Sequence, residues 1–388
     1  MRKVLDVFLT FLRLGCTSFG GPVAHLAYFQ REFVQRRHWV DDATFGECVA
    51  LTQLLPGPSS SQTGMLLGWL CAGPPGAVAA WIGFTLPSAV LMTVFALALP
   101  RVDVHAGWLH GLLLAAAAVV ASAIVSLRRS LVPDLAHAAL TIAVLALILA
   151  APFAFVTPLA IGGSALVGLT LPSTYVASEP RLDLRIPQRG GVTVLLLLVV
   201  TFVALRIWAS HGTHLAILAN TLFRIGSLVF GGGHVVLPLL QTQAVLAGIV
   251  DSRAILAGYA AAQAIPGPLF TLAAYVGARA WNSSLGVSGA LVAVVAIFAP
   301  SFFLLAGVAP FYRRLSASGQ FRAALAGANA GVVGLLCAAF VNPIFTTAVR
   351  TPLDGIVALV AFAAVQYANV PPWVIVILAA LFGYIVER

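Results

Sequence analysis

The sequence predicts an all-α polytopic membrane protein, and three observations lead to this fold class. First, 61% of the 388 residues are hydrophobic, and only 9% are charged. Soluble globular proteins carry roughly 25% charged residues, so this chain cannot cover the surface of a soluble domain. Second, apolar segments recur at about the 20-residue length of a transmembrane helix. Third, the chain repeats its own motifs, as many membrane carriers do.

The net charge of +9 has two interpretations. Nucleic-acid binding is excluded because no soluble surface is present on which a basic patch could lie. An excess of cations in a membrane protein instead reports its orientation through the positive-inside rule. The cysteines lie in apolar segments without CxxC spacing and predict neither disulfides nor a metal site, and no cofactor is expected; they are Cys16, Cys48, Cys71 and Cys337.

A tandem duplication organises the chain. The segment at 12–21, Leu-Arg-Leu-Gly followed by Phe-Gly-Gly, returns at 223–232 with only aliphatic and aromatic changes around the arginine. The Pro-Gly-Pro at 56–58 returns at 266–268, and the offset between copies stays between 210 and 213. So constant an offset indicates a true repeat. The predicted units are an N-terminal repeat (1–172), a connector with one extra span (173–211) and a C-terminal repeat (212–388).

Each repeat is expected to begin with two apolar stretches that are broken in the middle, one by glycines and one by Pro-Gly-Pro. Asp41 and Asp251 stand at equivalent places before a helix and are expected to cap it. Four continuous spans then follow in each repeat. The expected elements are 4–33, 44–72, 77–99, 107–127, 134–151 and 153–171, the extra span 192–209, and 215–248, 254–281, 286–309, 322–341, 353–368 and 371–386.

The basic residues favour re-entrant hairpins over full crossings for the four broken stretches. If each stretch enters and leaves the membrane on one side, 13 of the 21 Lys and Arg residues are cytoplasmic and six are external. Full crossings would place the clusters at 31–37 and 128–129 on opposite sides, which the positive-inside rule disfavours. The span at 192–209 then inverts the second repeat. The sequence therefore predicts inverted-topology repeats with a cytoplasmic N-terminus.

The four breaks are candidate ligand-binding positions. Irregular backbone is tolerated in a membrane only where protein or a water-filled cavity surrounds it, and carriers use helix N-termini at such breaks to bind anions. The alternative is that glycine and proline only kink these helices or let them pack closely. The candidate residues are Gly20, Gly21, Pro22, Pro56, Gly57, Pro58, Ser59, Ser60, Gly231, Gly232, Gly233, Pro266, Gly267 and Pro268.

Arg13 and its repeat partner Arg224 carry the strongest chemical signal. An arginine in an apolar segment costs a few kcal/mol or more if it faces lipid, so both are expected to face the protein interior. The guanidinium fork matches an oxyanion bidentately and stays charged at every working pH. Two alternatives remain open: each arginine pairs with a structural carboxylate, or it extends to the membrane interface.

Five further polar residues lie near the breaks. Glu47, His25 and His234 are candidates for proton coupling, since a buried carboxylate or an imidazole can exchange protons. Gln53 and Gln263 precede the two Pro-Gly-Pro motifs and are candidate ligands of the substrate. For each of them an ordinary role is the alternative: an interfacial carboxylate, packing histidines and packing glutamines.

Several mechanisms are disfavoured because their motifs do not occur. The sequence contains no GxxxxGK[ST] loop for ATP, no HExxH and no GxSxG. An enzyme is therefore not predicted.

The repeated motifs resemble those of the chromate ion transporter family. They are Phe-Gly-Gly-Pro at 19–22, Leu-Leu-Pro-Gly-Pro at 54–58, Phe-Gly-Gly-Gly at 230–233, Ile-Pro-Gly-Pro at 265–268 and the run at 76–87. The resemblance implies a multi-pass carrier of the bacterial inner membrane that exports chromate, in a family where some members are half-sized and work as pairs. A homodimer therefore stays open. The alternatives are uptake or exchange of sulfate or another oxyanion, and a membrane scaffold subunit that transports nothing.

Overall fold

The computed structural model describes residues 2–19, 21–98, 107–150, 156–171, 184, 186–229, 235–245 and 247–386. Within these residues the secondary structure is helical and no strand occurs, which confirms the all-α class. Five of the described helices are long and apolar enough to cross a membrane, and four shorter apolar helices accompany them. The chain is thus a polytopic helical membrane protein.

In the first repeat, short helices precede longer ones, and one further helix leads to the second repeat. They are α1 (Arg2–Thr17), α2 (Gly21–Phe29), the π-helix η1 (Gln30–Arg36), α3 (Asp42–Leu54), α4 (Ser59–Ala98), α5 (Gly107–Leu131), α6 (Leu135–Ala150), α7 (Val156–Gly168) and α8 (Gln188–Ser210). The long helix α4 contains non-helical backbone at Ala72 and Gly73, which separates the expected second and third segments.

The second repeat follows the same order with shorter pieces between its helices. It contains α9 (His214–Leu228), α10 (Val236–Leu239), the π-helix η4 (Leu240–Ala244), α11 (Ser252–Ala264), η5 (Leu269–Thr271), α12 (Leu272–Ser283), α13 (Gly286–Val308), η6 (Ala309–Phe311), α14 (Tyr312–Ala317), α15 (Gly319–Ala339), the π-helix η7 (Phe340–Phe345), α16 (Thr346–Ala348), α17 (Pro352–Gln366) and α18 (Pro372–Val386).

Local sequence explains where the broken stretches start and stop. The carboxylates of Asp41 and Asp251 each accept a hydrogen bond from a backbone N–H of the first turn, at 2.8 Å, so both predicted N-caps are confirmed. The helices α3 and α11 both end at a Pro-Gly-Pro motif, where extended backbone at Leu55 and Ile265 stops them. The predicted breaks at these motifs are therefore present in both repeats.

The two ends of each first broken stretch lie close to each other. Arg37, which follows η1, pairs with Asp6 near the start of α1 at 2.9 Å. In the second repeat, the Trp281 N–H at the end of α12 donates to the Ile249 carbonyl beyond η4 at 2.9 Å. The Trp281 ring also stacks on His214 at the start of α9, with centroids 4.1 Å apart. Both repeats therefore form hairpins whose open ends gather together.

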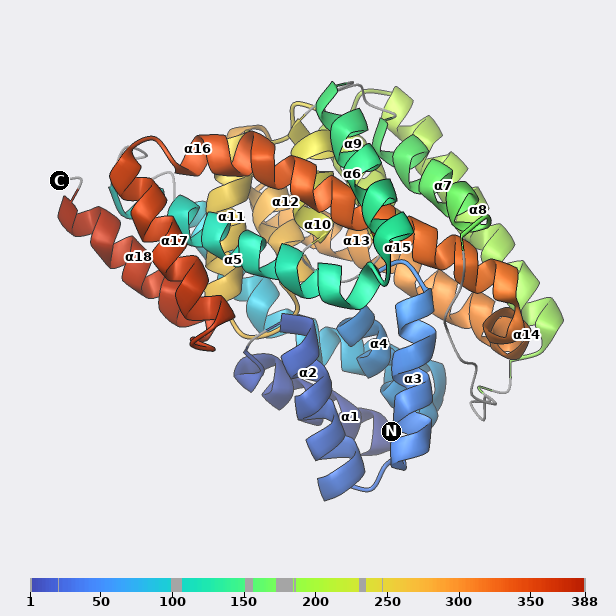
Figure 1. Cartoon of the computed structure of the whole chain (residues 1–388). Helices are drawn as coiled ribbons and strands as arrows, with labels where there is room; N and C mark the ends of the chain where they lie inside the picture. The colour runs from blue at the N-terminus through green and yellow to red at the C-terminus, as the bar shows by residue number, and fades with distance from the viewer. Residues whose placement is uncertain are drawn as a thin grey trace.

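The last helices of each repeat pack on the other repeat. Helix α5 contacts α17 and α18, whereas α15 contacts α6 and α7 (Figure 1). Glycines allow this close approach: a Cβ on Gly168 of α7 would lie 2.5 Å from the Ala323 carbonyl oxygen of α15. A Cβ on Gly383 of α18 would likewise meet the Gly107 carbonyl of α5. Small residues at helix contacts are typical of membrane proteins, and here they interlock the halves.

The glycine of the repeated Arg-x-Gly motif has a packing role. A Cβ on Gly15 of α1 would lie 2.7 Å from the Phe84 carbonyl oxygen of α4, and one on Gly226 of α9 would meet the Ile297 carbonyl of α13. Both contacts are with backbone, which cannot move aside as a flexible side chain can. The first helix of each repeat is thus fixed against the third segment of the same repeat.

We expect Gly15→Ala and Gly226→Ala each to destabilise the protein by about 1–3 kcal/mol, because the new methyl group overpacks a backbone contact. The thermal midpoint of unfolding of the purified protein in detergent measures the change. Gly46→Ala is the matched control, since Gly46 lies in the helix α3 with nothing within 4 Å of its added Cβ. Wild-type midpoints for both test variants would contradict this account.

Candidate functional site

Backbone hydrogen bonds join the breaks of the two repeats. The Gly57 N–H donates to the Val229 carbonyl at 2.6 Å, and the Gly267 N–H donates to the Ser18 carbonyl at 2.9 Å. Ser18 follows α1 and Val229 follows α9, so each Pro-Gly-Pro loop is bonded to the end of the first helix of the other repeat. The two bonds occupy equivalent positions in the duplicated sequence. The four hairpin tips therefore meet in two pairs, each formed by one tip from each repeat.

Both glycines at this junction are required by geometry. Gly57 has φ of 126° and Gly267 has φ of 101°, a backbone region that side chains disfavour. A Cβ at either position would also lie 2.8 Å from a hydroxyl oxygen, that of Ser301 for Gly57 and that of Ser88 for Gly267. Each serine thus lies against the loop of the opposite repeat. Sequence reasoning did not name these serines as site residues. The available signal was a Pro-Ser pair that occurs at 87–88 in the first repeat and at 300–301 in the second.

The start of α4 collects polar side chains. Ser60 and Ser61 are 4% and 2% exposed, and the Nδ1 atom of the buried His25 lies 3.2 Å from the Ser60 hydroxyl oxygen. Gln62 donates from Nε2 to the Pro56 carbonyl at 2.8 Å and to the Ser301 hydroxyl oxygen at 3.3 Å. This arrangement brings together residues of α2, α4 and the second repeat. Of these contacts, the proximity of His25 and Ser60 links two candidates that the sequence had identified separately.

Several buried polar atoms at this place have no partner among the described residues: Ser18 Oγ, His25 Nε2, Ser61 Oγ and Gln62 Oε1. Buried polar groups are almost always hydrogen-bonded, so such a cluster is suited to bind a polar ligand or water. The first N–H groups of α4 add donors and a partial positive charge. The described residues contain no group of three or more His, Cys, Asp and Glu able to hold a metal ion. The arrangement is a neutral cluster of buried polar atoms beside a helix N-terminus.

Arg13 belongs to an ion-pair network. Its Nη2 atom lies 2.6 Å from Oε2 of Glu32, a residue that is only 5% exposed. Arg37 and Arg36 contact the same carboxylate at 2.7 and 3.2 Å, and Arg37 also pairs with Asp6. Pairing with a carboxylate was one alternative for Arg13, and its role in substrate binding stays a prediction. Sequence reasoning missed Glu32, although an acidic residue inside an apolar stretch was visible.

Arg224 has a different environment. It is half-buried in α9, and within the described part of the chain it forms neither an ion pair nor a hydrogen bond. The charged group that acts on it is Arg206 of α8, which carries the same sign. Among the described residues, Arg224 therefore has no acidic partner, whereas its repeat partner Arg13 pairs with Glu32. The predicted role of Arg224 in anion binding also remains a prediction.

The other candidates are distributed around the breaks. Gly21 and Pro22 form the first turn of α2, and Ser59 begins α4 as its motif predicted. Glu47 is half-buried on α3, and Gln53 is exposed near the end of the same helix. Their proposed roles are untested by this geometry. Gln263 is half-buried with its Nε2 atom unpartnered in the described region, and the prolines Pro58, Pro266 and Pro268 flank the loop glycines.

Five candidates lie outside the described residues, so their positions carry no argument. They are Gly20, Gly231, Gly232, Gly233 and His234.

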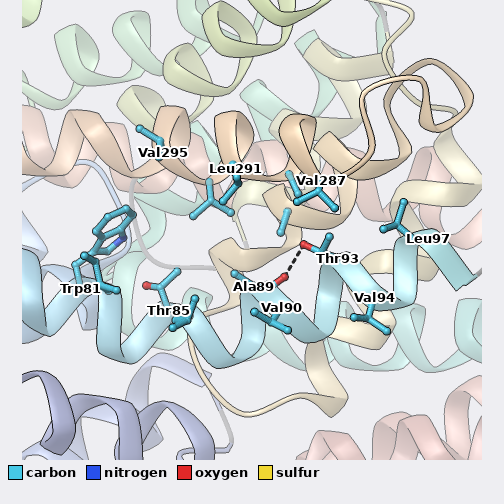
Figure 2. Close-up of a pocket in the computed structure, with 15 residues that line it drawn as sticks. Trp81, Thr85, Ala89, Val90, Thr93, Val94, Leu97, Val287, Leu291 and Val295 are labelled. Carbon is cyan, nitrogen blue, oxygen red and sulfur yellow. Dashed lines mark hydrogen bonds between the residues drawn. The ribbon is translucent and has the colours of Figure 1, made fainter.

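An apolar pocket of about 430 Å³ opens between α4 and α13 (Figure 2). Its polar groups are those of Trp81, Thr85 and Thr93, and the Thr93 hydroxyl already donates to the Ala89 carbonyl at 2.7 Å. No charged residue lines it, and aliphatic side chains form the rest of the wall. Such a lining suits hydrocarbon and gives an anion no charge-assisted hydrogen bond. The chemistry of the candidate site therefore lies at the hairpin tips and at the arginines.

Comparison with known proteins gives consistent matches along the chain. A family model described as chromate transporter matches residues 5–169 and 216–384. A chromate transport protein of Pseudomonas aeruginosa is 32% identical over 409 residues, covering 98% of this chain and 92% of that protein. A chromate transport protein of Cupriavidus metallidurans is 25% identical over 397 residues, with coverages of 98% and 92%. An uncharacterized transporter of Methanocaldococcus jannaschii is 25% identical over 395 residues, with coverages of 99% and 94%. No solved structure matches.

We expect Glu32→Gln to lower the free energy of unfolding by about 1–3 kcal/mol, because it removes the charged acceptor shared by three arginines. Chemical denaturation of the purified protein in detergent measures this loss. Asp42→Asn is the matched control: it removes an exposed carboxylate of the same repeat that accepts a hydrogen bond from the neutral Gln30 amide, and a smaller effect is expected. Equal losses in the two variants would show that the network has no special stabilising role.

Proposed function

Because the chain belongs to the chromate transporter family, we propose that this multi-pass membrane protein is a secondary transporter that exports chromate across the bacterial inner membrane. Export of chromate would confer resistance to it. The family is one of transporters, so no enzymatic activity is proposed. The observation that supports the proposal best is the meeting of the four hairpin tips, where buried polar atoms without partners surround the start of α4.

The chemistry of chromate fits these groups. Chromate is a tetrahedral dianion that accepts hydrogen bonds at every oxygen, and helix N-termini and arginine forks are the groups that proteins use for such ions. Arg13 and Arg224 are the proposed cationic ligands, and the serines and exposed N–H groups at the breaks are the proposed neutral donors. Neutral donors bind the ion without trapping it, which a transport site requires.

The membrane potential supplies a driving force for export. A potential that is negative inside drives an anion outward with about 2.3 kcal/mol per elementary charge per 100 mV, and chromate carries two charges. ATP hydrolysis is therefore unnecessary. Proton coupling through His25 or Glu47 stays an optional part of the proposal, because His25 lies buried beside Ser60 at the proposed site.

Inverted topology and alternating access complete the proposal. The open ends of the hairpins of the first repeat gather around Asp6 and Arg37, and those of the second gather around His214 and Trp281. Since the tips of the two repeats meet each other, the open ends are proposed to face opposite sides of the membrane, with the N-terminus cytoplasmic. Movement of one set of hairpins against the other would then expose the tips to each side in turn.

We expect Arg224→Ala and Arg13→Ala each to abolish chromate transport, because the anion loses a charge-assisted ligand. The assay is chromate flux in liposomes that contain the purified protein and carry an imposed membrane potential. Sulfate, tested in parallel, distinguishes chromate export from the transport of other tetrahedral anions. Arg189→Ala is the control, an exposed arginine at the other end of the neighbouring helix α8. Full transport by both test variants would refute the role of these arginines.

The topology proposal is tested by single cysteines at positions 38, 130 and 316 in a background without the four native cysteines. All three are expected to resist a membrane-impermeant thiol reagent applied from outside, since the proposed topology places them in the cytoplasm. A cysteine at position 211 is the control and is expected to react. Modification of the three test positions from outside would overturn the proposed orientation.

A further inference from the structure

The second hairpin arm of each repeat contains a π-helix at an equivalent place. The π-helix η1 begins at Gln30, and η4 begins at Leu240, 210 positions later. This separation lies within the offset of 210 to 213 that relates the repeats. Single π-helical turns inside α-helices are rare and occur frequently at functional sites. The duplication has therefore kept an unusual backbone geometry, although the residues within the two segments differ.

A hydrogen bond fixes how the two π-helices correspond. Gln30 donates from Nε2 to the Asp42 carboxylate at 2.9 Å, and Gln241 donates from Nε2 to the Ser252 carbonyl at 3.2 Å. These partners lie at the start of α3 and α11, which are equivalent helices. Gln241 thus takes the place of Gln30, and counting two residues onward places Gln243 where Glu32 lies.

The arginines obey the same correspondence. Arg13 and Arg224 differ by 211 positions, as do Glu32 and Gln243. In the first repeat, α1 and η1 bring Arg13 to 2.6 Å from Glu32. In the second repeat, α9 contacts η4. Gln243 therefore lies on the segment that packs against the helix carrying Arg224.

The two side chains differ in charge and not in length. Glutamate and glutamine have the same length, but a carboxylate only accepts hydrogen bonds, whereas an amide also donates two. Gln243 is 8% exposed, and both its Nε2 and Oε1 atoms lack a partner among the described residues. Arg224 likewise has no acidic partner in that part of the chain. In its described residues, the second repeat therefore has a cation and an amide without partners where the first repeat has an ion pair between Arg13 and Glu32.

We propose that Arg224 and Gln243 form an oxyanion-binding pair in this conformation, and that Glu32 is a built-in carboxylate occupying the equivalent place beside Arg13. The transported anion would then fill, in the second repeat, the position that Glu32 fills in the first. This inference rests on the proposed function, because it names residues that bind the transported tetrahedral dianion. It assigns a role to Glu32 and Gln243, neither of which the sequence motifs identify.

Equilibrium binding of chromate to the purified full-length protein in detergent tests the pair. Gln243→Glu places a carboxylate opposite Arg224, as Glu32 stands opposite Arg13, and is expected to weaken chromate binding about 10- to 100-fold through loss of charge-assisted hydrogen bonds. A carboxylate at position 243 would also repel chromate directly, so the double-mutant cycle uses Gln243→Leu: in an Arg224→Gln background this change is expected to have less than a twofold further effect. That non-additivity is a readout that a merely structural role would not produce.

The outcomes separate this inference from the proposed function. A wild-type protein that neither binds nor transports chromate refutes the proposed function. Wild-type binding that is unchanged in a folded Gln243→Glu variant overturns the pairing alone, as does an equal loss with and without Arg224. If the glutamate variant does not fold, chromate binding by Gln243→Leu tests the pair instead, because this change removes the amide donors without adding charge. An affinity for chromate reduced several-fold supports the pair, and one within twofold of wild type overturns it.

Discussion

Two backbone hydrogen bonds between the repeats are the constraint on which the candidate site depends. They join Gly57 to Val229 and Gly267 to Ser18, and each one ties a Pro-Gly-Pro loop to the opposite half. An N–H or C=O left unpaired in a membrane costs several kcal/mol, so broken helices persist only where something satisfies the free backbone groups. Here each repeat supplies a backbone carbonyl that accepts a hydrogen bond from the loop glycine of the other repeat. Neither repeat alone can complete the places where the tips meet.

The exchange of helices at the ends of the repeats extends the same principle. Helices α17 and α18 cover α5, and α6 and α7 cover α15, through glycine contacts close enough to touch backbone (Figure 1). Between membrane helices the gain comes from close packing rather than from exclusion of water. The interlocked spans therefore hold the two repeats together independently of the hydrogen bonds at the hairpin tips.

Much of the fold was predictable because its signals are local or repeated. Apolar length predicted the spans, Pro-Gly-Pro predicted two breaks, and aspartates before helices predicted the caps at Asp41 and Asp251. The site was predictable only in part. Contacts such as that between Gly57 and Val229 join positions far apart in the chain, and no local pattern encodes which tip meets which. Glu32 was not predicted as a site residue for another reason. Its repeat partner is Gln243, so a search for residues that are identical in both repeats finds neither of them.

The gradient sets the direction of net flux, and that substitution bears on how the two halves of a duplicated carrier can differ in affinity for the anion. Two inverted halves with identical chemistry would offer an anion equivalent sites from either side, and nothing in the protein would distinguish them. A change from carboxylate to amide preserves the volume and packing of the hairpin arm while altering the local charge by one unit. In a partly buried place, where the effective dielectric constant is well below that of water, one charge outweighs most packing differences. Arg224 has no acidic partner in the described part of the chain, so under the proposal an anion would meet its guanidinium directly, whereas an anion at Arg13 would first have to displace Glu32.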